Sequence, residues 1–234
     1  MLSFLTLSIG SASVDIIILL LAFLTLKPQV TNCVFRDPQP DGMDAACTLE
    51  SICGADSPVV HYEIDWTKEG SLHNWVEKFD LLCRPKVQSA SLGACFFLGW
   101  VCTLWWVPRF SDMFSRKKIF GIGLFVNLLV YVAILAANKL EQICFLILVL
   151  GFFTTTRSSV SYVYLLELVP KRIQSSYGGL FVMVSSLIIP ITVLYFWFVS
   201  NDWIYIHYFG IGCQVVCLVC LYFIPESPRL LIEL

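Results

Sequence analysis

Six apolar runs, each about as long as a bilayer is thick, constrain the fold of this chain more than any other feature of its sequence. About 20 consecutive apolar residues are enough to cross the hydrocarbon core as a helix. Only 14% of the residues are charged and 58% are hydrophobic, whereas soluble domains have about 25% charged residues. The predicted spans are Leu2–Leu26, Ser89–Val107, Ile119–Ala137, Gln142–Leu165, Gln174–Val199 and Trp203–Ile224. We therefore predict an all-α, multi-pass integral membrane protein.

A short basic loop gives the expected orientation of these spans. Pro108–Lys118 contains one acid and four bases, and Lys and Arg close to the ends of spans mark cytoplasmic loops. The first span lacks a basic start and a cleavage site, so it is interpreted as a true span rather than a secretory signal. The predicted parts are span one (1–26), a large extracellular loop (27–87), spans two to six with short loops (88–224) and a cytoplasmic tail (225–234).

The large extracellular loop is predicted to contain disulfide bonds. It has an even number of cysteines in what is expected to be an oxidising compartment. These are Cys33, Cys47, Cys53 and Cys83. Four cysteines allow three pairings, and the sequence does not distinguish between them. In the second half of the loop, Ser71–Leu82 has apolar residues at helical spacing, which predicts a helix lying on the membrane surface.

Two charged side chains lie inside predicted spans, Asp15 in the first and Arg157 in the fourth. The helical rise places Arg157 roughly 22 Å from the outer end of its span and Asp15 roughly 16 Å from the inner end of its own. These depths allow the two groups to pair, which would offset the unfavourable burial of both. Alternatively, Asp15 bonds to Ser11 or Ser13 one turn away, and Arg157 extends to the cytoplasmic headgroups.

Several classes of function are disfavoured by what the spans and loops contain. Outside the spans there is no Gly-rich phosphate loop, no basic face and no His/Cys cluster with metal-ligand spacing. We therefore expect no nucleic-acid partner, no cofactor, no metal site and no catalytic residues. His207 lies near the outer end of the sixth span and is interpreted as a solvated side chain.

Four motifs resemble those of a known family. They are Trp75…Phe79-Asp80-Leu81-Leu82-Cys83, Arg109…Asp112…Arg116-Lys117-Lys118, Tyr162-Val163-Tyr164-Leu165-Leu166-Glu167-Leu168-Val169 and Pro225-Glu226-Ser227-Pro228-Arg229. On these motifs the chain resembles the organic cation and anion transporters of the major facilitator superfamily, and it is similar to protist-type members. The resemblance is weaker over the first span and the start of the outer loop. Met113 and Ser115 replace the usual Arg and Gly of the basic loop, which is expected to weaken its charge network and its tight turn.

The resemblance implies both a fold and a set of interacting charges. Superfamily members have two six-span halves around a site near the midplane, and each half is a 3+3 inverted repeat. This chain is predicted to be the N-terminal half, which requires a second half or a homodimer partner. The resemblance also implies a gating cluster at the inner end of the bundle. Its residues are Arg109, Asp112, Arg116, Lys117, Lys118, Glu167, Arg172, Glu226 and Arg229.

The resulting hypothesis is a transporter that moves small organic ions or solutes across the bilayer by alternating access. It is expected in the plasma membrane, with an internal membrane as the alternative. We expect Asp15, Thr154, Thr155 and Arg157 to contact the substrate or a coupling ion. A competing hypothesis is a non-transporting structural subunit of a larger membrane complex, derived from a transporter. An enzyme is disfavoured because no nucleophile–base or metal constellation can be drawn from the sequence.

Overall fold

The computed structural model describes residues 1–35, 49–54, 59–66 and 71–226, and these form a helical bundle with a small extension at one end. In the described residues, five helices are long and apolar enough to cross a membrane, and a pair of helices bent by 43° is a sixth candidate. The five are α1 (Leu2–Leu24), α6 (Arg116–Ala136), α7 (Leu140–Leu168), Lys171–Phe198 and α10 (Ile204–Tyr222), and the bent pair is α4 (Lys86–Thr103) with α5 (Val107–Met113). The predicted all-α membrane bundle is confirmed.

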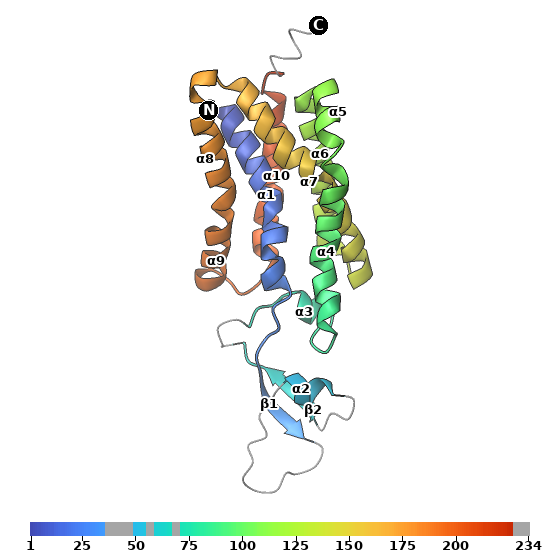
Figure 1. The fold of residues 1–234 in the computed structure, drawn as a ribbon. Coiled ribbons are helices and arrows are strands. Elements are labelled where there is room, and N and C mark those ends of the chain that lie inside the picture. Colours follow the sequence, from blue (N-terminus) through green and yellow to red (C-terminus); the bar gives the residue numbers. More distant parts are fainter. Residues whose placement is uncertain (36–48, 55–58, 67–70, 227–234) are drawn as a thin grey trace.

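The two ends of the bundle carry different structures. The start of α1, the α5–α6 connection and the end of α10 lie together at one end, and the two strands lie beyond the other (Figure 1). The basic loop and the cysteine-containing loop are therefore at opposite ends of the helices.

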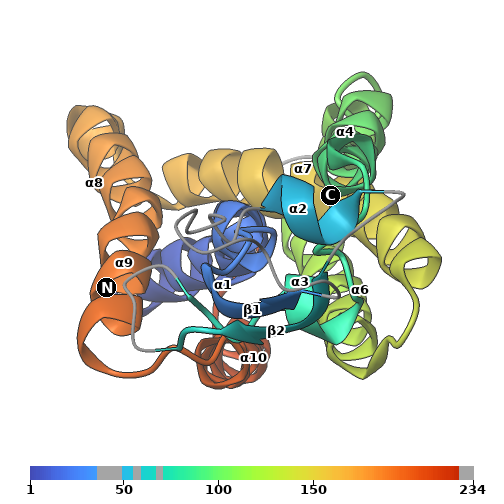
Figure 2. The same cartoon turned by 90° about the horizontal axis from the view of Figure 1, so that it is seen from below.

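Helix α7 is the element against which much of the bundle packs. It contacts α4, α6 and α1 and crosses the middle of the bundle when this is viewed along its length (Figure 2). A Cβ placed at Gly99 would overlap the carbonyl oxygen of Leu148, and one at Gly151 would overlap that of Phe96. Such close backbone approach stabilises helix pairs in lipid. Gly93 of α4, by contrast, faces only a leucine side chain at ordinary contact distance.

The fifth span is interrupted at its middle. After a short 3₁₀ helix, η1 (Lys171–Ile173), it consists of α8 (Gln174–Ser186) and α9 (Ile188–Phe198). The break lies just before Pro190, because proline has no N–H for the carbonyl one turn earlier and its ring crowds that carbonyl.

The outer loop contains strands that the sequence reasoning missed. Strand β1 (Val30–Phe35) pairs with β2 (Val59–Ile64) in an antiparallel two-stranded sheet, and α2 (Leu49–Cys53) precedes β2. The helix predicted over Ser71–Leu82 is much shorter in the structure, where α3 spans only Trp75–Lys78. Soon after it, Asp80 adopts a left-handed backbone conformation with φ 51°, which ends the helix.

Side chains around α3 fasten the loop to the outer end of the bundle. The Asn74 amide donates to the carbonyl oxygen of Phe23 (2.9 Å) in the last turn of α1 and to that of Leu26 (2.7 Å) just beyond the helix. The fully buried ring of Trp75 contacts Trp203 edge-on, with 6.0 Å between ring centroids. The loop is therefore attached to both α1 and the start of α10.

The cysteines of the outer loop are oxidised where the structure describes them. A disulfide joins Cys53 at the end of α2 to Cys83 after α3. Cys33 is disulfide-bonded as well, while Cys47 lies outside the described residues. The predicted disulfide content of the loop is confirmed for the Cys53–Cys83 bond.

Candidate functional site

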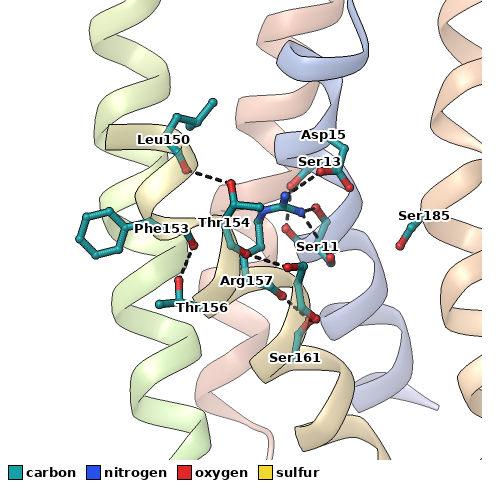
Figure 3. A network of polar contacts seen from close by, with 12 residues as sticks. Ser11, Ser13, Asp15, Leu150, Phe153, Thr154, Thr156, Arg157, Ser161 and Ser185 are labelled. Atoms are coloured by element: carbon teal, nitrogen blue, oxygen red, sulfur yellow. Dashed lines mark hydrogen bonds and ion pairs between the residues drawn. The ribbon is translucent and has the colours of Figure 1, made fainter. Parts of the chain in front are cut away.

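The two charges inside the bundle meet across the α1–α7 interface. An Arg157 Nη2 atom lies 2.6 Å from Asp15 Oδ1. The other terminal nitrogen, Nη1, donates to the backbone carbonyl of Ser11 and lies 3.3 Å from the Ser11 hydroxyl. Figure 3 shows the guanidinium reaching from α7 to these groups on α1. The pairing expected from the depths of the two residues is therefore present.

The two ends of this ion pair differ in exposure. The Arg157 side chain is 1% exposed, whereas that of Asp15 is 30% exposed. Because arginine keeps its proton in proteins, a buried guanidinium needs an acceptor, and Asp15 provides it. The alternative in which Arg157 extends to the headgroups is wrong, because the side chain is buried and bonded to Asp15. Ser13 does not hold the carboxylate, because its hydroxyl donates to the carbonyl of Gly10 (3.2 Å).

The threonines beside Arg157 are largely engaged within the bundle. Thr154 donates to the Leu150 carbonyl oxygen one turn earlier on α7 (2.9 Å). The Thr155 hydroxyl lies 2.8 Å from that of Thr103 on α4, and both are fully buried. Thr155 thus connects two helices, and its predicted contact with a substrate stays a prediction. Thr103 is a partner that the sequence reasoning missed.

A second charged cluster lies at the C-terminal end of α7. Arg116, near the start of α6, donates from Nη2 to Asp112 Oδ1 (2.5 Å) and from Nε to Glu167 Oε1 (2.8 Å). Its side chain is 8% exposed, while Asp112 is 49% and Glu167 is 19% exposed. This arrangement joins the α5–α6 connection to the last turn of α7. Three residues of the predicted gating cluster are thus in contact, and their gating role stays a prediction.

The segment after α10 is bound to the same end of the bundle. Lys117 Nζ donates to the carbonyl oxygens of Tyr222 (3.2 Å) and Ile224 (2.5 Å). The Ser115 hydroxyl donates to the Glu226 carboxylate, and the Tyr164 hydroxyl donates to a carbonyl in the same segment. Lys117 and Glu226 therefore connect α6 to the segment that follows α10.

The expected weakening of the basic loop at Ser115 is not seen. Ser115 has φ −63°, a conformation open to any residue, so a glycine is not needed there. The residue also caps α6, because its hydroxyl accepts from the Lys118 backbone N–H (3.5 Å). The substitution therefore adds polar contacts at this turn without backbone strain.

The remaining members of the predicted gating cluster are on the surface or outside the described residues. Arg109, Lys118 and Arg172 are exposed, and Arg229 lies outside the described residues. Among the described residues, no group of three or more His, Cys, Asp or Glu side chains is arranged to hold a metal ion.

One residue judged from the sequence to be solvated is in fact buried. His207 is 0% exposed, its Nδ1 lies 2.6 Å from the Trp203 carbonyl oxygen, and its ring lies near that of Tyr131. The sequence interpretation placed it at the membrane surface, but the outer loop covers this end of α10 through the Trp75–Trp203 contact.

Comparison with known proteins identifies the class to which this bundle belongs. Residues 23–234 match the family model described as sugar (and other) transporter. The chain therefore belongs to the sugar (and other) transporter family, and it is a multi-pass membrane protein of the major facilitator type. This membership favours a transporter over the structural-subunit hypothesis.

A curated relative makes the resemblance more specific. The chain is 25% identical over 178 residues to solute carrier family 22 member 4 of Mus musculus, over 72% of this chain and 31% of the relative. The match thus covers about a third of the relative's length.

Proposed function

We propose that this protein takes part in moving a small organic ion across the membrane by alternating access, with the Asp15–Arg157 pair in its solute pathway. The observation that carries this proposal is the asymmetric exposure of the pair, with a buried guanidinium and a carboxylate that is 30% exposed. A charged residue inside a membrane protein generally faces a pathway or a partner. Support also comes from the family match and the solute-carrier relative.

The pair could bind either a positively or a negatively charged solute. An organic cation would approach the exposed Asp15 carboxylate, and an organic anion would compete with it for the guanidinium. Arg157 Nε is buried and has no hydrogen-bond partner among the described residues, so a helix movement that admits an anion would also give this donor a partner. Either event would weaken the α1–α7 connection and so link solute binding to helix movement.

The pathway proposed here also requires a second structural unit. We propose that a second six-helix half or a second copy of the chain covers the pathway face, and that the assembly resides in the plasma membrane. The Lys171–Phe198 span supports this, because 11% of its 18-residue apolar window is buried in the described structure, compared with 59% for that of α1.

Uptake into proteoliposomes tests the proposal. Radiolabelled tetraethylammonium and benzoate would serve as organic cation and anion, with the full chain reconstituted alone and with a candidate second half. We expect uptake of one probe, and Asp15→Asn should reduce it strongly while Asp80→Asn, on the exposed outer loop, should not. Absence of uptake of both probes in every combination would refute the proposal.

A further inference from the structure

Four polar side chains between α6 and α10 are fully buried and lack partners for six of their polar atoms within the described residues. Each of the four side chains is 0% exposed. The atoms are Asn127 Oδ1 and Nδ2, Tyr131 OH, His207 Nε2, and Gln214 Oε1 and Nε2. Two come from α6 and two from α10, and none belongs to the Asp15–Arg157 pair.

Contacts of two glycines fix the register of the three helices here. A Cβ placed at Gly10 of α1 would lie 3.6 Å from Leu124 of α6 and 3.4 Å from Cys217 of α10. A Cβ placed at Gly210 of α10 would lie 3.0 Å from the Tyr131 hydroxyl. Residues 124 and 217 are therefore at one level of the bundle, and residues 131 and 210 are at another.

The two amides lie between these levels. Asn127 falls midway between residues 124 and 131 on α6, and Gln214 falls midway between residues 210 and 217 on α10. Both are fully buried, so both are enclosed at the same depth of the α1–α6–α10 interface. Tyr131 and His207 continue this polar region by one to two turns, with 5.7 Å between their ring centroids.

The chemistry of this set suits water. Buried polar groups in proteins are nearly always satisfied by protein or by ordered water, and a buried water makes about three hydrogen bonds. The two amides offer donors and acceptors together, as does the Tyr131 hydroxyl. Because His207 Nδ1 donates to the Trp203 carbonyl, its neutral Nε2 is an acceptor. A neutral mixture of donors and acceptors fits water better than a cation, which needs acceptors alone.

We propose that Asn127, Tyr131, His207 and Gln214 form an internal water-binding site in the α1–α6–α10 interface. Trp203, one turn from His207, lines a pocket of about 530 Å³ at the outer end of the bundle. The site lies beside the helix that carries Asp15 and does not depend on which solute the protein moves.

Radiolytic hydroxyl-radical labelling of the full chain in lipid nanodiscs tests this proposal, because radicals formed from bound water label residues that bulk solvent does not reach. We expect Tyr131 and His207 to be labelled, although both are 0% exposed. Phe120 is also 0% exposed, on α6, and it should stay unlabelled. Labelling of Tyr131 and His207 no greater than that of Phe120 would overturn the proposal. That result is expected if the two amides bond directly to each other and the site holds no water.

Substitution at the site provides a second readout. Asn127→Leu and Gln214→Met nearly conserve volume and remove the amides, so labelling of Tyr131 should fall to the Phe120 level. Phe120, which is buried, should stay unlabelled in both variants, which shows that they are folded, and labelling of the exposed Tyr208 should not change. Persistent Tyr131 labelling in both variants would contradict the assignment of the amides as water ligands. The wild-type experiment stands even if neither variant folds.

Discussion

The ion pair inside the bundle and the charged cluster at its end use the same chemistry in different surroundings. Each has an arginine bonded to a carboxylate, at 2.6 Å for Arg157–Asp15 and at 2.5 and 2.8 Å for Arg116 with its two partners. Arg157 and Asp15 are 1% and 30% exposed, whereas Arg116 and Asp112 are 8% and 49% exposed. Distances alone therefore do not rank these contacts, because surface ion pairs contribute little while breaking a buried pair is strongly unfavourable.

The largest effect is expected for Asp15→Asn, which leaves the Arg157 guanidinium buried without its counter-charge. We expect the free energy of unfolding to fall by about 3–5 kcal/mol, measured by thermal and denaturant unfolding in detergent. Asp80→Asn is a matched control, because Asp80 is exposed and asparagine tolerates its left-handed backbone. A loss no greater than that of the control would show that the interior pair behaves like a surface one.

An intermediate effect is expected for Arg116→Gln. This change removes two charge-assisted hydrogen bonds at a side chain that is 8% exposed, but one of its two partner carboxylates, Asp112, is 49% exposed. We expect a loss of about 2 kcal/mol and earlier separation of the α6 and α7 ends, measured by hydrogen–deuterium exchange of the last turn of α7. Lys118→Gln, at a neighbouring exposed position, is the control. Equal losses from Arg116→Gln and Asp15→Asn would remove the distinction between the two regions.

The smallest effect is expected for Asp112→Asn, because half of this carboxylate is exposed. The loss should stay below about 1 kcal/mol, and it should shrink as salt is raised because exposed charges are screened. Unfolding curves at low and high ionic strength measure both quantities. A loss that is large and independent of salt would mean that the cluster is shielded from solvent, contrary to its exposure.

The sequence was sufficient to predict the features that follow from helix geometry and lipid chemistry. The lengths of the apolar runs predicted the spans, and the depths of Asp15 and Arg157 along their helices predicted that they could meet. Both inferences depend on a fixed rise per residue and on the high cost of an isolated charge in lipid. The break before Pro190 follows from the same kind of local rule.

Features that depend on contacts between distant segments were not predictable. The β1–β2 pairing joins segments separated by a stretch of loop, and no local pattern revealed it. His207 looked solvated because its position along α10 is near the outer end, but Trp75 and Trp203 cover that end. Thr103 carries no signal of its own until α4 is placed against α7, where it meets Thr155.

The central claim is that Asp15 and Arg157 form a coupled pair inside the bundle, and a double-mutant cycle tests it most directly. The unfolding free energies of wild type, Asp15→Asn, Arg157→Gln and the double variant would be compared in the same detergent. We predict that the double variant loses less than the sum of the two single losses, with a coupling of about 1–3 kcal/mol. Losses that simply add would contradict the account, because they would show that the two charges do not stabilise each other.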